Sequence, residues 1–177
     1  MWETPNLDKT WMLKLNFNKI FLCSIIFVVI FFIDRVSKIY IINIADVSNE
    51  VDIYINPYLN LYLIWNKWIA FGFLSFDGSF IYNLISVVIA IISLVVLMLT
   101  IKNKGIKRYS LIFILGGAVG NLFDRIYYSA VPDFIDLHIG DYHWFIFNVA
   151  DIFITFGVIC LILFELTCKN KVNNEIS

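Results

Sequence analysis

Three aspartates interrupt otherwise apolar stretches of this chain: Asp34, Asp124 and Asp151. A carboxylate inside a membrane helix costs roughly 2.5–3.5 kcal/mol on insertion scales, so each of them needs a physical or chemical reason. Counted along helices from the flanking basic residues, the three carboxylates lie roughly 21–27 Å from the same face of a bilayer. We therefore expect them at a similar depth, where a bundle of spanning helices could bring them together.

A fourth carboxylate, Asp133, lies in the short link before the last apolar stretch. Pro132 excludes a helix at this point, and the apolar pair Phe134-Ile135 predicts a segment that turns back against the bundle. Asp133 and Asp151 could then face each other. Two carboxylates in one poorly solvated site cannot both ionise cheaply, so they share a proton, as hydrolysis by an activated water requires.

Each of these acids also has a structural interpretation. Asp34 and Lys38 are four residues apart on one helix face, in the favourable order for an ion pair. Asp124 is next to Arg125, and an orienting role suits it better than a direct chemical one. Asp151 has no basic residue within one turn of its own helix, so among the three acids it is the one for which a purely structural role is the weakest explanation.

Two amides precede two of the acids at helical spacing. Asn121 and Asn148 each lie three residues before an aspartate, so each shares a helix face with it and could orient a carboxylate or hold a peptide backbone. The segment 116–120 contains Gly-x-x-x-Gly, which is typical of close helix packing in lipid. Such packing would bring Asn121 towards a neighbouring helix.

Both histidines of the chain, His138 and His143, lie near Asp136 and Asp141. Their spacing of five residues matches no standard zinc signature, so a metal site is conceivable there but not expected. Neither a serine elbow nor a glycine-rich phosphate loop is present in the sequence. We expect no metal and no organic cofactor.

The composition excludes several classes of protein. Hydrophobic residues make up 60% of the 177 residues and charged residues 15%, whereas a soluble domain averages about 45–50% and 25%. A soluble or disordered chain is therefore excluded. The net charge of −1 and the lack of a basic stripe argue against nucleic acid as a partner. The cysteines are too few for a disulfide framework and serve as small apolar side chains: Cys23, Cys160 and Cys168.

Four apolar stretches predict a single all-α membrane domain over residues 1–177, with helices at about 18–44, 80–101, 109–126 and 145–168. A retained first span is favoured over a cleaved signal peptide because no small-residue cleavage site follows it. Lysine and arginine concentrate before the first helix, between the second and third, and after the fourth. The positive-inside rule therefore predicts cytoplasmic termini and an outer location for the acids.

The outer segment of about 45–79 is more than a linker. The stretches 51–56 and 59–65 are rich in strand-forming residues, and Asn56-Pro57 marks a turn between them. We expect a small strand-rich element on the membrane surface that contacts lipid or a lipid-bearing ligand. An interfacial loop anchored by aromatic side chains is the alternative.

Four segments, in this order, resemble the motifs of the lipoprotein signal peptidase (signal peptidase II) family, bacterial aspartic peptidases of the inner membrane. A single motif would be weak, but all four on four predicted spans are specific, and the likeness covers about residues 20–165. The segments are Asp34-Arg35-Val36-Ser37-Lys38, Asn66-Lys67-Trp68-Ile69-Ala70-Phe71-Gly72, the run 116–125 (Gly-Gly-Ala-Val-Gly-Asn-Leu-Phe-Asp-Arg), and Val131-Pro132-Asp133-Phe134-Ile135 with Phe147-Asn148-Val149-Ala150-Asp151.

The resemblance implies that Asp133 and Asp151 are the catalytic pair. It implies a prolipoprotein substrate whose cysteine carries diacylglycerol, cleaved just before that cysteine at the outer face of the inner membrane, and we expect a monomer. Two positions depart from the family pattern: Trp68 replaces the usual Gly, and Pro132 replaces the usual Val. The implied supporting residues are Asp34, Lys38, Asn66, Gly117, Asn121, Asp124, Arg125, Asn148 and Ala150.

Two other functions would also place carboxylates in a membrane. A transporter or proton relay predicts ionisable groups at several depths, whereas here they cluster in the outer third, with Glu165 alone near the inner face. A membrane scaffold predicts that Asp133 and Asp151 tolerate replacement by asparagine. We expect a peptidase.

Overall fold

Helices and strands alternate in blocks along the computed structural model, which describes residues 7–67 and 78–176, with side chains described for 20–67 and 82–168. The order over this part of the chain is α1, β1, β2, α2, α3, β3, β4, α4. The helices are α1 (Leu7–Ser48), α2 (Gly78–Lys102), α3 (Gly105–Tyr128) and α4 (Val149–Ile176). The strands are β1 (Asp52–Asn56), β2 (Leu59–Asn66), β3 (Val131–Ile139) and β4 (Tyr142–Phe147).

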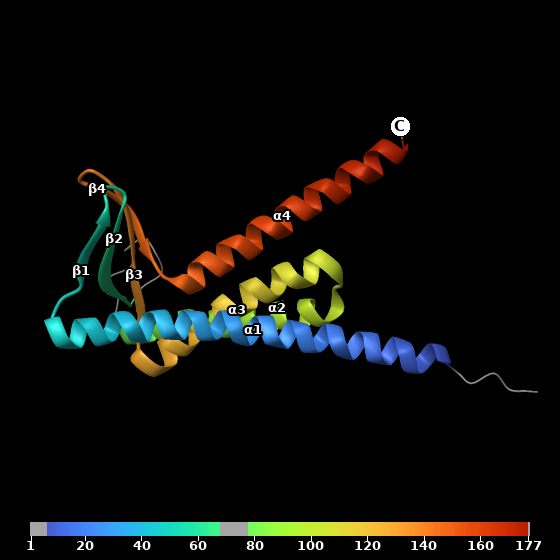
Figure 1. Ribbon diagram of the computed structural model, residues 1–177, viewed down its shortest axis with the longest axis horizontal. Coiled ribbons are helices and arrows are strands. Elements are labelled where there is room, and N and C mark those ends of the chain that lie inside the picture. The colour runs from blue at the N-terminus through green and yellow to red at the C-terminus, as the bar shows by residue number, and fades with distance from the viewer. Residues whose placement is uncertain (1–6, 68–77, 177) are drawn as a thin grey trace, which may run out of the picture.

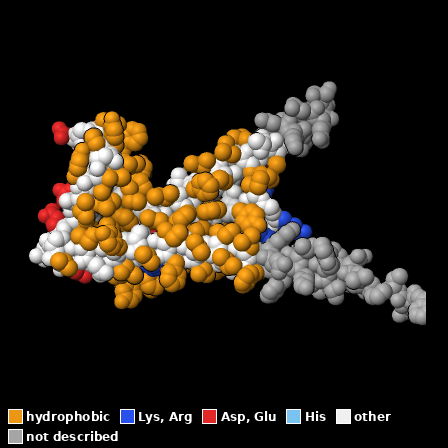
Figure 2. Space-filling view, viewed as in Figure 1, with side chains coloured by type: hydrophobic (Ala, Val, Ile, Leu, Met, Phe, Trp, Pro, Cys, Tyr) orange, Lys and Arg blue, Asp and Glu red, His pale blue; other side chains and the backbone are white. Residues whose placement is uncertain are grey.

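The four predicted spans are confirmed. The segments long and apolar enough to cross a bilayer are Ile20–Ser48, Tyr82–Lys102, Gly105–Tyr128 and Val149–Cys168. Large apolar side chains stay exposed along these helices, as Figure 2 shows, and such a surface is suited to lipid rather than to water. The chain is therefore a multi-pass membrane protein.

All four strands form one antiparallel sheet in the order β1-β2-β3-β4. The predicted strand-rich element after the first helix is thus confirmed for β1 and β2, while residues 68–77 lie outside the described residues. The sequence does not predict β3 and β4, and it starts the fourth helix at 145 instead of Val149. Phe145, Ile146 and Phe147 continue directly into the apolar run of α4, and periodicity cannot separate so short an apolar strand from a helix start.

Pro132 fits into β3 because of where the neighbouring strands pair. It lies opposite Trp65 of β2, while β4 pairs with β3 only from Ile135 onward. At Pro132, the edge of β3 that faces β4 is therefore unpaired. The N–H group that proline lacks would make no hydrogen bond between strands on that edge, so proline is tolerated there. The turn between β3 and β4 places Gly140 at a φ of +58°, a conformation that glycine adopts without strain.

The sheet stands at one end of the helix bundle, and the start of α1 and the end of α4 lie at the other end (Figure 1). Most Asp and Glu side chains on the face in Figure 2 lie at the sheet end, whereas Lys and Arg gather at the opposite end. The start of α1 and the end of α4 thus lie at the end where Lys and Arg gather, which agrees with the expectation that both termini lie on the same, basic side. The cytoplasmic location of that side stays a prediction.

Helix α3 lies at the centre and packs against α1, α2 and α4. Its glycines allow the close approach: a Cβ on Gly116 would lie 2.7 Å from Ile30 of α1, and one on Gly120 would lie 2.7 Å from the Asp34 carboxylate. A Cβ on Gly117, on the other side, would strike the backbone oxygen of Ala150 in α4. The predicted close helix packing around Gly-x-x-x-Gly is therefore present.

Candidate active site

Asn148 joins the two aspartates of the predicted pair. It lies between the end of β4 and the start of α4. Its side-chain Nδ2 donates to Asp133 Oδ1 at 2.6 Å, and its backbone N–H donates to Asp151 Oδ2 at 3.1 Å. The backbone N–H of Asp151 donates in return to Asn148 Oδ1 at 3.2 Å. The two reciprocal hydrogen bonds between Asn148 and Asp151 cap the start of α4. Together with the bond to Asp133, they make Asn148 a shared partner of both carboxylates.

Asp133 is buried in β3, with 5% of its surface exposed. Asn66 of β2 donates from Nδ2 to Asp133 Oδ2 at 2.8 Å, so each carboxylate oxygen accepts an amide hydrogen bond. Burial raises the pKa of the Asp133 carboxyl to about 6; the Asn66 and Asn148 amides oppose this rise, and the negative charge of Asp151 adds to it. This carboxyl can therefore hold or release a proton near neutral pH.

Asp151 is half-buried in the first turn of α4, where the helix dipole favours a negative charge. Asn121 of α3 donates from Nδ2 to Asp151 Oδ1 at 2.8 Å. Within the described residues, neither Asp151 nor Asp133 forms an ion pair. Both carboxylates are thus held by amides alone, which leaves them able to exchange protons.

Next to this pair lies a buried ion cluster of two acids and two bases, made by Asp34, Arg35 and Lys38 of α1 with Asp124 of α3. The Lys38 ammonium is fully buried and lies 2.9 Å from Asp34 and 2.6 Å from Asp124. The Arg35 guanidinium lies 2.9 Å from Asp34 and 2.5 Å from Asp124. The formal charges cancel, as buried charges in a membrane require. The predicted Asp34–Lys38 ion pair is present.

Two hydrogen bonds connect the ion cluster to the aspartate pair. Lys38 Nζ donates to Asn121 Oδ1 at 2.8 Å, on the same amide whose nitrogen holds Asp151. Asp34 Oδ1 accepts from the backbone N–H of Ala150 at 3.0 Å. The cluster therefore fixes both the amide partner of Asp151 and the start of its helix.

Comparisons with known proteins show the family to which the chain belongs. A family model described as "Signal peptidase (SPase) II" matches residues 26–167. The chain belongs to the signal peptidase II family. This confirms the resemblance that the four sequence motifs indicate.

Curated relatives of this signal peptidase II chain are themselves lipoprotein signal peptidases. That of Pelagibacter ubique (strain HTCC1062) is 55% identical over 162 residues, covering 92% of this chain and 98% of the relative. That of Aquifex aeolicus (strain VF5) is 36% identical over 150 residues, covering 84% and 87%. A solved bacterial membrane enzyme, determined by the in meso method, has a TM-score of 0.69 at 28% identity and covers 85% of this chain and 90% of its own. A lipoprotein signal peptidase function is thereby supported.

Arg125 of this signal peptidase II chain does not pair with Asp124, although the two residues are adjacent in the sequence. Asp124 pairs with Arg35 and Lys38, whereas Arg125 forms no ion pair among the described residues. Its side chain is half-buried, close enough to Asp133 and Asp151 to interact electrostatically, and Nη1 donates to the Asn121 carbonyl oxygen at 3.3 Å. It is thus a free cation beside the pair within the described part of the chain.

Sequence reasoning missed two contributors to the site. Arg35 completes the ion cluster, and its signal was present, since it directly follows Asp34 in the first motif. Tyr82 of α2 donates its hydroxyl hydrogen to the Arg125 carbonyl oxygen at 2.8 Å, and nothing in the local pattern marks it. The departure at Trp68 lies outside the described residues.

Proposed function

We propose that this chain is an aspartic endopeptidase whose catalytic pair is Asp133 and Asp151. Its proposed substrates are prolipoproteins that carry diacylglycerol on a cysteine, and the bond cleaved lies just before that cysteine. The observation that carries the proposal is the amide bridge of Asn148, which contacts both carboxylates without neutralising either.

The proposed chemistry divides acid and base work between the two carboxyls. The ionised member takes a proton from a water molecule, whose oxygen then attacks the scissile carbonyl carbon. The protonated member donates a hydrogen bond to the carbonyl oxygen and later gives its proton to the leaving amine. A pKa of about 6 at Asp133 suits a pair that shares one proton near neutral pH.

The remaining residues act as positioning groups in this proposal. Arg125 and the amides orient substrate and carboxylates, while the buried ions and the close α3–α4 contact hold the two elements that carry the pair. The set is Asp34, Lys38, Asn66, Gly117, Asn121, Asp124, Arg125, Asn148 and Ala150. No step of the reaction uses a metal ion or an organic cofactor.

The exposed aromatic side chains of the sheet support a lipid-bearing substrate. Tyr54, Trp65, Trp144 and Phe145 each expose a large part of their surface beside the membrane-spanning helices. Aromatic rings of this kind prefer the membrane–water interface. We infer that the sheet lies at the outer face of the bacterial inner membrane and contacts the acyl chains of the substrate, which a monomeric chain can do alone.

Cleavage of a diacylglyceryl-modified prolipoprotein by the purified chain in detergent, followed by gel shift, tests the proposal. We expect Asp133→Asn and Asp151→Asn each to lose about a hundredfold or more in rate, since each removes one half of the acid–base pair. Asp52→Asn, on exposed β1, is the matched control and keeps the wild-type rate.

Full activity in either catalytic variant would refute the assigned pair. A loss confined to Asp124→Asn would transfer the chemistry to the ion cluster. Addition of EDTA does not abolish cleavage, because no metal ion contacts the reacting atoms, and complete loss of cleavage in a chain that stays folded in EDTA would instead indicate metal-dependent hydrolysis.

A further inference from the structure

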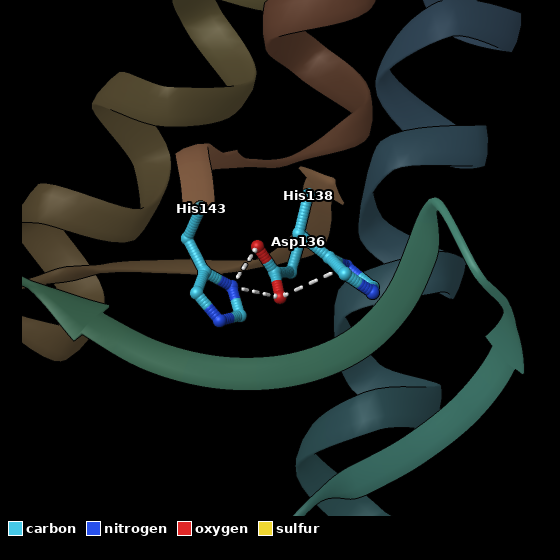
Figure 3. Close-up of side chains that lie close together, drawn as sticks. All are labelled: Asp136, His138 and His143. Atoms are coloured by element: carbon cyan, nitrogen blue, oxygen red, sulfur yellow. Dashed lines mark hydrogen bonds and ion pairs between the residues drawn. The ribbon is translucent and has the colours of Figure 1, made fainter. Parts of the chain in front are cut away.

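Away from the catalytic pair, the β3–β4 hairpin brings one aspartate and two histidines together (Figure 3). Asp136 and His138 are two residues apart on β3, and His143 of β4 pairs directly with His138. Figure 3 shows the Asp136 carboxylate between the two imidazole rings. His143 Nδ1 lies 2.8 Å from Asp136 Oδ2, and His138 Nδ1 lies 3.7 Å from the same oxygen.

Two of the three side chains are buried in the sheet. Asp136 is 2% exposed and His138 is 9% exposed, while His143 closes the site from the solvent side. His138 Nδ1 is buried and has no hydrogen-bond partner among the described residues. A buried polar atom without a partner is costly, so this nitrogen, aimed at Asp136 but too distant to bond to it, indicates a missing ligand.

A second unpartnered atom belongs to the neighbouring strand. Asn60 of β2 pairs with Asp136 of β3, and its Oδ1 is buried with no hydrogen-bond partner among the residues described. Two neighbours of Asp136, His138 on the same strand and Asn60 opposite it on β2, thus each have one buried polar atom without a hydrogen-bond partner in the described part of the chain. The His138 nitrogen can act as a ligand to a cation at Asp136, and a simple Asp136–His143 ion pair does not satisfy it.

We propose that Asp136, His138 and His143 bind one divalent transition-metal ion, with Zn²⁺ as the ion that fits best. Two imidazole nitrogens and one carboxylate oxygen are a common zinc ligand set. Ligand atoms at about 2.0–2.2 Å from a tetrahedral ion lie about 3.3–3.6 Å from one another. The observed 2.8 Å and 3.7 Å bracket this spacing, and all the ligand atoms lie within 4.8 Å of one another. A water molecule completes the coordination.

The proposed ion is structural. It joins β3 to β4 three residues from Asp133 and stiffens the strand that carries this acid, without contacting the reacting atoms. The sequence spacing of five residues gives no sign of it, because the pairing of β3 with β4, and not the distance along the chain, brings the ligands together.

The test uses the full chain in detergent, purified without a polyhistidine tag and stripped of metal with EDTA. The two histidines of the site are the only two in the chain, so an imidazole signal has one source. We expect one Zn²⁺ per chain by calorimetric titration, and a visible spectrum of nitrogen- and oxygen-bound Co²⁺ that Zn²⁺ displaces. His138→Gln and His143→Gln each weaken Zn²⁺ binding about tenfold or more, and Asp141→Asn, in the same hairpin, leaves it unchanged.

Unchanged Zn²⁺ binding in a His138→Gln/His143→Gln double variant would overturn the proposal, as would a wild type that binds no Zn²⁺. A melting temperature measured in parallel guards against misfolding: Zn²⁺ raises that of the wild type and not that of the double variant, while the two agree in EDTA. Should the double variant fail to fold, the wild-type Co²⁺ spectrum decides. Because none of these readings depends on peptide cleavage, the metal site and the proposed peptidase mechanism stand or fall separately.

Discussion

Asp34 of α1 accepts a hydrogen bond at 3.0 Å from the backbone N–H of Ala150, in the first turn of α4. The first N–H groups of a helix have no partner within it, so a carboxylate at that end satisfies one of them and interacts favourably with the helix dipole. Since Asp151 is the next residue, this contact sets the position of a catalytic candidate from another helix.

Asp34→Asn is expected to destabilise the chain and lower its activity together. The change leaves Arg35 and Lys38 with only one acid, and breaking a buried ion pair in this way costs about 3–5 kcal/mol. Thermal unfolding in detergent measures the loss. Asp46→Asn, an exposed acid on the same helix, is the control, and equal melting of the two variants would show that the ion cluster does not hold α4.

Gly117→Ala should harm the chain more than Gly116→Ala. A Cβ at Gly117 strikes the backbone oxygen of Ala150, which cannot move without displacing α4, whereas a Cβ at Gly116 meets only side-chain atoms, Cγ2 and Cβ of Ile30, which a small shift of α1 relieves. We expect Gly117→Ala to lose most of its activity and several degrees of melting temperature, and Gly116→Ala to lose less. The reverse order would show that the contact between α3 and α4 tolerates separation.

Residue types and spacing were enough to predict the four spans and the acids that converge. Apolar length determines a span almost alone, and a carboxylate inside one is conspicuous because it is costly. The Asp34–Lys38 pair follows from helix geometry, since residues four apart must share a face. The partner of Asp124 could not be predicted in this way, because Arg35 and Lys38 reach it from another helix.

The sheet shows the same limit. The strands β1 and β2 are joined by a short turn that local sequence reveals, but β2 also pairs with β3, which follows it in the sequence only after two membrane helices. The bond from Asn66 to Asp133 depends on that pairing, and the cluster of Asp136, His138 and His143 depends on the pairing of β3 with β4. Contacts between segments distant in sequence leave no periodicity to read, so they emerge only from the fold.

Asn66→Ala is expected to shift the pH dependence of cleavage. The Asn66 amide donates to the Asp133 carboxylate and favours its ionised form, so its removal raises the pKa of Asp133 above about 6. One hydrogen bond to a charged group is worth about 1.5–3 kcal/mol, which corresponds to a shift of about one pH unit or more. The pH profile of kcat/KM, whose limbs report the acid and base of the free enzyme, measures the shift.

The control for this profile is Asn83→Ala, an exposed asparagine on α2, which should leave both limbs in place. A uniform loss of rate in Asn66→Ala with no movement of either limb would contradict the prediction. It would mean that Asn66 contacts substrate and does not tune the acid.

Asp133→Asn is expected to flatten the dependence of stability on pH. The pKa of Asp133 is about 6 in the folded chain against 3.8 ordinarily, because burial disfavours its charged form. A carboxyl with a raised pKa favours the folded state below its ordinary value, and that contribution is lost as pH rises through about 6. The wild type should lose about 3 kcal/mol of stability from this group between about pH 4 and pH 6.

Melting temperatures across this range in detergent should fall more steeply for the wild type than for Asp133→Asn, whose amide does not titrate. Asp52→Asn, at a carboxylate exposed on β1, should follow the wild-type slope. Parallel slopes for the wild type and Asp133→Asn would show that the Asp133 carboxyl stays ionised throughout this range, and the proposed shared proton would then have to reside elsewhere.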